Sequence, residues 1–129
     1  MKTRELIKKP PLTVTPDATL LEAADLLTKH SVGALVVVNP ENPNMPLAVL
    51  SERDIVRAIS MRMALSTPVE AFMSTTLVTV DADEPVEKAA ELMWINNIRH
   101  LVVTEGGKMA GVISIRDIIN PQTLRQICR

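Results

Sequence analysis

The apolar residues of this chain form two kinds of pattern, a helical spacing and a short continuous run, and each pattern occurs twice. Residues three or four positions apart predict one apolar helix face in each half of the chain. These faces consist of Leu20, Ala23, Ala24 and Leu27 in the first half and of Val86, Ala89, Ala90 and Met93 in the second. A short run rich in Val and Leu follows each helix, at Ala34–Val38 and His100–Thr104, and such runs predict buried strands. The pattern therefore predicts two copies of one unit.

A direct alignment of the two halves supports this repeat. Thr13–Val38 aligns with Thr79–Thr104, and after a short gap in the loop Asn39–Leu47, Val49–Ile55 aligns with Val112–Ile118. The aligned stretches share a Thr-Val pair, an Ala-Ala pair in the helix and a Leu-Val-Val run in the strand. A match of this extent indicates an internal repeat. It extends upstream, where Leu6-Ile7 aligns with Phe72-Met73.

The remaining elements complete the same order in both copies. An opening strand is predicted at Leu12–Val14 and Leu77–Val80, and a third strand at Leu47–Leu50 and Met109–Ile113. A second helix is predicted to open at Ser51 and at Ser114. Strands joined by a tight loop pair antiparallel, and the strand before the helix can join them in parallel. We therefore expect a mixed α/β (α+β) fold of two tandem β-α-β-β-α motifs.

The predicted boundaries place motif 1 at residues 1–65 and motif 2 at residues 66–129. A half of this size buries too little surface to be stable by itself, so the motifs are expected to pack into one compact module with a pseudo-twofold relation. Between them, Met61–Leu65 is predicted to prolong the preceding helix and Val69–Met73 to form a short helical turn. Asn39–Asn44 is predicted as a loop, and Pro121–Cys128 as a last helix capped by Asn120.

Local signals also mark the starts of the first helix in each motif. Thr19 and Glu22 have the spacing of a capping box. Asp83 precedes Glu84-Pro85, which predicts a helix start with proline in its first turn.

Composition and charge exclude several classes of function. The 129 residues carry a net charge of −1 and 2% aromatic residues, which gives no footprint for nucleic acid or an anionic membrane. No apolar run is long enough to span a bilayer, and the N-terminus does not resemble a signal peptide. One cysteine, Cys128, allows no internal disulfide and no zinc motif. A cytoplasmic location without membrane or nucleic-acid partners is expected.

Catalytic patterns are missing from the sequence as well. The four glycines, Gly33, Gly106, Gly107 and Gly111, do not form a phosphate-binding loop. No nucleophile with a matching base and no paired-histidine metal motif stands out. We expect no catalytic residue, no metal and no cofactor, and an enzyme is the weakest of the functions considered.

The start of the second helix carries the most specific pattern. Both copies read apolar-apolar-Ser-x-Arg-Asp-Ile, at Val49–Ile55 and Val112–Ile118. Ile98–Val103 adds a basic pair ahead of a strand. With the doubled element order, these motifs resemble the CBS domain pair, also called the Bateman module, over nearly the whole chain.

The resemblance implies a regulatory module that binds adenosine nucleotides such as AMP, ADP or ATP in two clefts between the motifs. In that family the signature Asp and Ser hold the ribose, an apolar slot holds the adenine and basic residues meet the phosphates. A carboxylate can accept two hydrogen bonds, which matches the vicinal hydroxyls of ribose. Members often act as nucleotide or energy sensors and form homodimers, so this chain is expected to dimerise and to act on a separate effector protein or by itself.

The residues carried over to the two clefts differ in charge. The first cleft is predicted to contain Ser51, Arg53, Asp54, Leu77, Val78, Ile98, Arg99 and His100. The second is predicted to contain Leu12, Val32, Gly33, Ala34, Ser114, Arg116 and Asp117. Because Gly33-Ala34 replaces the cationic pair Arg99-His100, the Asp54 cleft is expected to bind phosphorylated adenosine better.

Simpler interpretations stay open at each of these positions. Ser51 with Asp54, and Ser114 with Asp117, also have the spacing of capping boxes. Arg53 and Arg116 also fit solvated first-turn residues. The alternative for the whole chain is a structural dimerisation or docking module with empty clefts.

Overall fold

The protein is described by a computed structural model for residues 1–128, and the chain divides into two compact units. Unit 2 is continuous and consists of Leu12–Leu77, whereas unit 1 combines Met1–Pro11 with Val78–Arg129. Each unit contains one three-stranded sheet. The N-terminal segment therefore belongs to the unit that contains the second motif.

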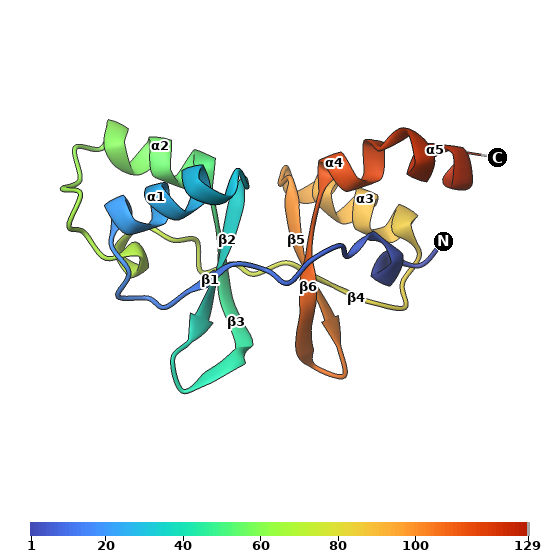
Figure 1. The fold of residues 1–129 in the computed structure, drawn as a ribbon, viewed down its shortest axis with the longest axis horizontal. Helices are drawn as coiled ribbons and strands as arrows, with labels where there is room; N and C mark the ends of the chain where they lie inside the picture. Colours follow the sequence, from blue (N-terminus) through green and yellow to red (C-terminus); the bar gives the residue numbers. More distant parts are fainter. Residues whose placement is uncertain (129) are drawn as a thin grey trace. The chain divides into compact units, whose positions relative to one another are not determined.

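Unit 2 has the predicted order of elements. Its elements are β1 (Thr13–Val14), α1 (Leu20–His30), β2 (Ala34–Asn39), β3 (Asn42–Ser51), α2 (Glu52–Ser60) and the 3-10 helix η2 (Val69–Ala71). Strand β1 pairs with β2 in parallel, and β2 pairs with β3 antiparallel. Both α1 and α2 cover the same face of this sheet (Figure 1).

Unit 1 repeats this order around the second sheet. Its elements are the 3-10 helix η1 (Thr3–Leu6), β4 (Thr79–Asp81), α3 (Val86–Asn96), β5 (His100–Glu105), β6 (Lys108–Ser114), α4 (Ile115–Ile119) and α5 (Pro121–Ile127). Strand β4 pairs with β5 in parallel, and β5 pairs with β6 antiparallel. The predicted β-α-β-β-α order is thus confirmed in both motifs, as is the last helix at Pro121.

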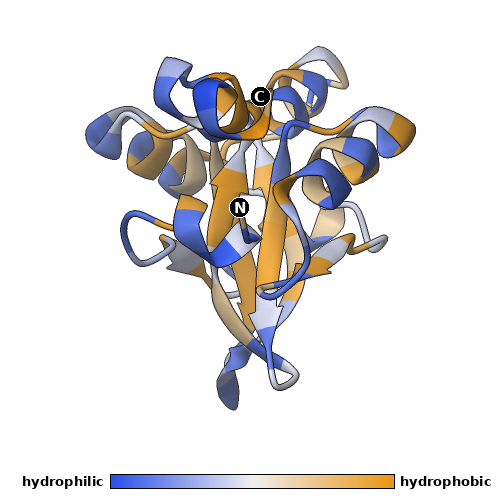
Figure 2. Cartoon of the chain, turned by 90° about the vertical axis from the view of Figure 1, so that its right-hand side faces the viewer, coloured by the Kyte–Doolittle hydropathy of each residue, from blue (hydrophilic) through white to orange (hydrophobic). Residues whose placement is uncertain are grey.

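Each unit has its own hydrophobic core beneath its helices. Three of the four residues predicted on each helix face are buried, namely Leu20, Ala23 and Leu27 in one core and Val86, Ala89 and Met93 in the other. The fourth residues, Ala24 and Ala90, are half-buried. The central strands add Leu35 and Val37 in unit 2 and Leu101 and Val103 in unit 1. Figure 2 shows the strands largely in the hydrophobic colour and the hairpin ends in hydrophilic to neutral colours. Full burial of each large aliphatic side chain stabilises the fold by about 1.5–3 kcal/mol.

The helices α1, α2 and α3 end in the same backbone motif, although none of them has a terminal glycine. Ser31, Arg62 and Asn97 adopt left-handed conformations with φ of 52°, 64° and 52°. After α2, the Met63 N–H donates to Ala58 O at 3.1 Å, and the Arg62 N–H donates to Ile59 O at 3.0 Å. These bonds define a Schellman motif. The predicted helical continuation over Met61–Leu65 is therefore wrong, because the chain reverses at Arg62.

The β2–β3 hairpin differs from the prediction. Strand β2 reaches Asn39 and β3 begins at Asn42, with register shifts around Val38, so the predicted loop at Asn39–Asn44 is largely strand. The β5–β6 hairpin turns at Gly106 and Gly107, whose φ values are 60° and 78°. Two left-handed residues suit the right-handed twist of the strands.

The short helices η1 and η2 are exchanged between the two motifs. Segment η1 precedes β1 of motif 1 in the sequence but packs in unit 1, and η2 precedes β4 of motif 2 but packs in unit 2. Their backbone bonds are equivalent under the repeat. The Thr3 N–H donates to Glu84 O at 2.9 Å, and the Val69 N–H donates to Ala18 O at 2.7 Å. The predicted boundaries at residues 1–65 and 66–129 follow the sequence repeat, whereas the contacts group the N-terminal segment with the second motif.

Apolar contacts hold the N-terminal segment in unit 1. Leu6 is 3% exposed and belongs to the core of that unit, and Thr3 is fully buried with its Oγ donating to Glu84 O at 2.8 Å. The Ile7 side chain covers Gly111, where an added Cβ would lie 2.8 Å from Ile7 Cγ2. Gly111 is therefore needed for close packing.

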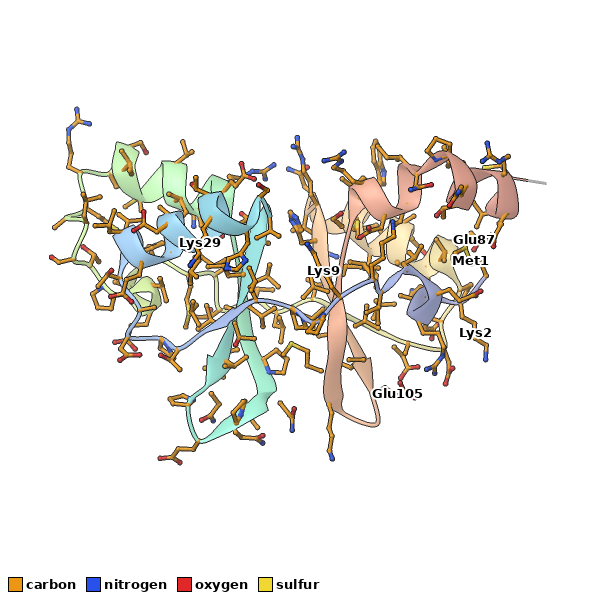
Figure 3. All side chains as sticks on the ribbon, in the orientation of Figure 1. Met1, Lys2, Lys9, Lys29, Glu87 and Glu105 are labelled. Atoms are coloured by element: carbon orange, nitrogen blue, oxygen red, sulfur yellow. The ribbon has the colours of Figure 1, made fainter. Side chains whose placement is uncertain are left out.

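Charged contacts surround this segment at the surface. Arg4 bonds Asp83 at 2.6 Å and Glu105 at 3.1 Å, and Lys2 lies 3.5 Å from Asp83. The hydrogen bond from Arg4 lowers the pKa of Asp83, and the bonds to both carboxylates raise the pKa of Arg4. Figure 3 labels Lys2, Glu105 and Met1 in this unit, and the Val86 N–H at the start of α3 donates to Met1 O at 3.0 Å. Asp83 therefore binds the N-terminal segment, and α3 begins at Val86 with Pro85 as its cap.

Candidate functional site

The signature of motif 1 forms a capping box at the junction of β3 and α2. The Ser51 N–H donates to Asp54 Oδ2 at 2.8 Å, and the Ser51 hydroxyl lies 3.1 Å from the same oxygen. Asp54 is 8% exposed. The capping interpretation is therefore confirmed for this pair. The capping box fixes the direction of the carboxylate through Oδ2, and Asp54 Oδ1 takes no part in it.

Arg57 occupies this second oxygen of Asp54. Its Nη2 donates to Asp54 Oδ1 at 2.9 Å and to Phe72 O at 3.3 Å. This ion pair was not predicted. The signal was present in the sequence, because residues three positions apart on a helix are neighbours.

The signature of motif 2 has the same box but a different outer oxygen. The Ser114 N–H donates to Asp117 Oδ2 at 2.7 Å, and the Ser114 hydroxyl lies 3.2 Å from it. Within residues 1–128, no protein group makes a hydrogen bond to Asp117 Oδ1. Asn120 stands where motif 1 has Arg57, and its side chain instead accepts a bond from the Gln122 N–H at 2.8 Å.

Each unit brings its signature next to the start of its own middle strand. In unit 2, Ala34 pairs with Ser51, and the Glu52 N–H donates to Gly33 O at 3.1 Å. In unit 1, His100 pairs with Ser114, and the Ile115 N–H donates to Arg99 O at 2.8 Å. The basic pair of motif 2 therefore adjoins the signature of its own motif, with Gly33-Ala34 in that position in unit 2.

The larger apolar residues of the predicted clefts lie at the margins of the two cores. Leu12 and Val32 pack against the core of unit 2, and Val78 and Ile98 pack against that of unit 1. Leu77 is half-buried at the end of unit 2. These side chains are partly accessible and apolar, as a purine slot requires.

The cations of the predicted clefts are at the surface of their units. Arg53, Arg99 and Arg116 are exposed, and His100 is half-buried. Both predicted clefts combine residues of unit 1 with residues of unit 2. Their assembly around one ligand stays a prediction.

Two other kinds of site are absent from the described part of the chain. Residues 1–128 contain no group of three or more His, Cys, Asp or Glu side chains placed to hold a metal ion. None of the helices in the same range combines the length and apolar character that a membrane crossing needs.

Comparisons with known proteins agree with the fold and the signature. The sequence profile of the CBS domain matches residues 4–61 and 69–121. The structure of CBS domain protein PAE2072 from Pyrobaculum aerophilum, complexed with AMP, superposes with a TM-score of 0.92 at 40% identity, covering 99% of this chain and 98% of that one.

Two further relatives extend the comparison. The CBS domain pair of MJ0100, in complex with 5′-methylthioadenosine and S-adenosyl-L-methionine, has a TM-score of 0.83 at 25% identity and 92% coverage of both chains. The mitochondrial CBS domain-containing protein CBSX3 of Arabidopsis thaliana is 38% identical over 112 residues, which is 84% of this chain and 54% of that protein. The chain spans between about half and two thirds of the length of the first curated relatives that it matches. With two matched motifs and the same fold, this chain belongs to the CBS domain family.

Proposed function

We propose that this CBS pair is a regulatory module that binds adenosine nucleotides, with Asp54 and Asp117 as the acceptors of the ribose hydroxyls. The observation that carries the proposal is the carboxylate geometry. In both motifs a capping box fixes one oxygen of the aspartate. In motif 2 the other oxygen makes no hydrogen bond to protein within residues 1–128. A fixed carboxylate with an open oxygen suits a ligand that presents hydroxyl donors.

The relatives narrow the chemical class of the ligand. AMP in one related structure and 5′-methylthioadenosine with S-adenosyl-L-methionine in another share an adenosine group. The ribose and adenine are therefore the common features to be recognised, and AMP is the first probe that we choose. ADP and ATP extend the series to longer phosphate chains.

Arg99 and His100 are proposed to contact the phosphates, which would favour AMP over adenosine. Arg99 is exposed directly before β5, and His100 is half-buried at the first position of that strand, so neither side chain belongs to the buried core. Arg99→Ala is expected to weaken AMP binding several-fold and to leave adenosine binding unchanged. Equal losses for both ligands would contradict the phosphate role.

Thermal unfolding with added nucleotide tests the proposal as a whole. A ligand at about 100 times its dissociation constant adds about 2.7 kcal/mol of stability, which raises the melting temperature by several degrees in a domain of this size. AMP, ADP, ATP and S-adenosylmethionine are compared on the wild type and on an Asp54→Asn/Asp117→Asn double variant. The exposed Asp25 on α1 gives the matched control, Asp25→Asn.

The expected result is a shift for the wild type and the control that is lost in the double variant. No shift with any adenosine compound would favour the alternative, a structural dimerisation or docking module without a small-molecule ligand. An equal shift in the double variant would place the ligand elsewhere.

A homodimer is proposed for the same module. Unit 2 exposes several apolar side chains on α2 and the turn after it, namely Val56, Ile59, Met61 and Leu65. Unit 1 exposes Trp94 to 87%, together with Ile95 and Ile119. Large exposed apolar side chains in such numbers indicate an interaction surface. Light scattering should give a dimer for the wild type and a monomer for Ile59→Glu, whereas a monomeric wild type would contradict this proposal.

A further inference from the structure

The two signature aspartates differ in the number of hydrogen bonds that they can still accept. An ionised carboxylate has about four lone-pair positions. In each motif the serine N–H and hydroxyl are directed at Oδ2, so Oδ1 provides the remaining places. Asp54 Oδ1 already accepts from Arg57, whereas Asp117 Oδ1 accepts from no protein group within residues 1–128.

Arg57 is held in this position by more than the ion pair. The same Nη2 atom donates to the carbonyl of Phe72, a residue of the unit 2 core. The Asp54 side chain is 11% exposed and the Arg57 side chain 49% exposed, and a hydrogen bond to a shielded carboxylate is electrostatically stronger than one in open solvent. Arg57 therefore belongs to the resting arrangement of the first signature.

In the part of motif 2 that the structure describes, up to residue 128, no side chain takes the place of Arg57. Asn120 stands at the corresponding position, but its side-chain oxygen caps α5 through the Gln122 N–H. The other arginine near this signature, Arg116, is exposed in the first turn of α4. Hence the difference between the two carboxylates comes from one residue.

We infer that Asp117 accepts both vicinal hydroxyls of a ribose, while Asp54 accepts only one because Arg57 occupies its outer oxygen. Arg57 is then a residue that determines sugar specificity. This inference rests on the proposed adenosine-nucleotide binding and makes its two sites unequal. A 2′-deoxyribose therefore makes one hydrogen bond fewer than ribose at Asp117. At Asp54 it makes the same number as ribose, because its remaining hydroxyl can still donate to the one free acceptor position of Oδ1.

This inequality concerns the sugar and is independent of the one expected for the phosphates. The exchange of Arg99-His100 for Gly33-Ala34 changes the cations proposed for the phosphate end. Comparison of AMP with adenosine therefore reports on the cations. Comparison of AMP with 2′-deoxy-AMP reports on the carboxylates.

Isothermal titration of single-site variants tests the inference. Asp117→Asn leaves the Asp54 site to be measured, and Asp54→Asn leaves the Asp117 site. Asparagine keeps an oxygen that can accept the serine N–H of the capping box. The preference for AMP over 2′-deoxy-AMP is expected to be about tenfold or more at the Asp117 site and within about threefold at the Asp54 site. Equal preferences, or the reverse order, would overturn the inference.

A second experiment tests the role of Arg57 by removing its side chain. In the Asp117→Asn background, Arg57→Leu frees the outer oxygen of Asp54 and is expected to raise the preference for AMP toward that of the Asp117 site. Arg125→Leu, which removes an exposed arginine from α5, is the matched control and should leave the preference unchanged. Melting temperatures of both variants identify any loss of folding, and an unchanged preference in folded Arg57→Leu would overturn the role of Arg57.

The outcomes separate this inference from the proposed function. If the wild type binds AMP and both sites show the same sugar preference, only the inference fails. If the wild type binds neither AMP nor the other adenosine compounds, the proposed function fails and the inference fails with it.

Discussion

Truncation of Leu6 tests whether the N-terminal segment is part of the fold of unit 1. Leu6 lies far from the rest of that unit in sequence, yet it is 3% exposed in its core. Leu→Ala in a core costs about 2–5 kcal/mol, with the larger values at sites that cannot relax. Segment η1 is a 3-10 helix of only four residues, so the cavity can partly collapse. We expect Leu6→Ala to lower the free energy of unfolding by about 2–3 kcal/mol.

Urea denaturation followed by circular dichroism measures this change. For a chain of 129 residues, an unfolding entropy of about 2.1 cal/mol/K per residue converts the loss into a fall of about 7–11 °C in melting temperature. Leu21→Ala is the matched control, because Leu21 is 46% exposed on α1. The control should change the free energy by less than about 0.5 kcal/mol.

The result that would refute this reasoning is a Leu6→Ala variant as stable as Leu21→Ala. The N-terminal segment would then be a loose extension, and the exchange of η1 and η2 between the motifs would have no energetic role. A loss near 2–3 kcal/mol would show that unit 1 requires both of its chain segments.

Three further changes test other parts of the fold. Gly111→Ala should lower the free energy of unfolding by about 1–2 kcal/mol, because the added Cβ meets the stiff side chain of Ile7. In urea denaturation, the double variant Ile7→Ala/Gly111→Ala should lose less free energy of unfolding than the sum of the two single variants. Because the pKa of Asp83 is lowered in the folded state, its contribution is present above the ordinary value near 3.8 and disappears as pH falls through the folded value. The stability difference between wild type and Asp83→Asn should therefore shrink below about pH 4, and a difference constant from pH 6 to pH 2.5 would contradict this. Asn120→Ala removes the cap of α5 and should cost about 1 kcal/mol in urea denaturation; an unchanged midpoint would contradict the cap.

The repeat made most of the fold predictable from sequence. Apolar spacing located the helices and strands, and the duplicated serine-aspartate signature located both capping boxes. The end of α2 was not predictable in the same way. Met61–Leu65 consists of good helix formers, and Arg62 gives no local signal for a left-handed residue, which is usually glycine or asparagine. Packing of Met63 against the core accompanies the reversal, and this is a tertiary effect.

The candidate site was predictable in its residue types and less so in its details. Asp54 and Asp117 look equivalent in the signature, so the difference between them depends on a side chain one turn further along the helix. Likewise, Asp83 matched a helix-start pattern, but in the structure it forms an ion pair with Arg4, which is distant in sequence. Such contacts between remote segments are not contained in local patterns.

A crystal structure of the protein with AMP tests the central claim most directly, because the claim concerns which atoms hold the ribose. We predict ribose hydroxyl oxygens at hydrogen-bond distance, about 2.5–3.0 Å, from the carboxylate of Asp117, with Asp54 still paired to Arg57. AMP bound with its ribose away from both aspartates would contradict the account.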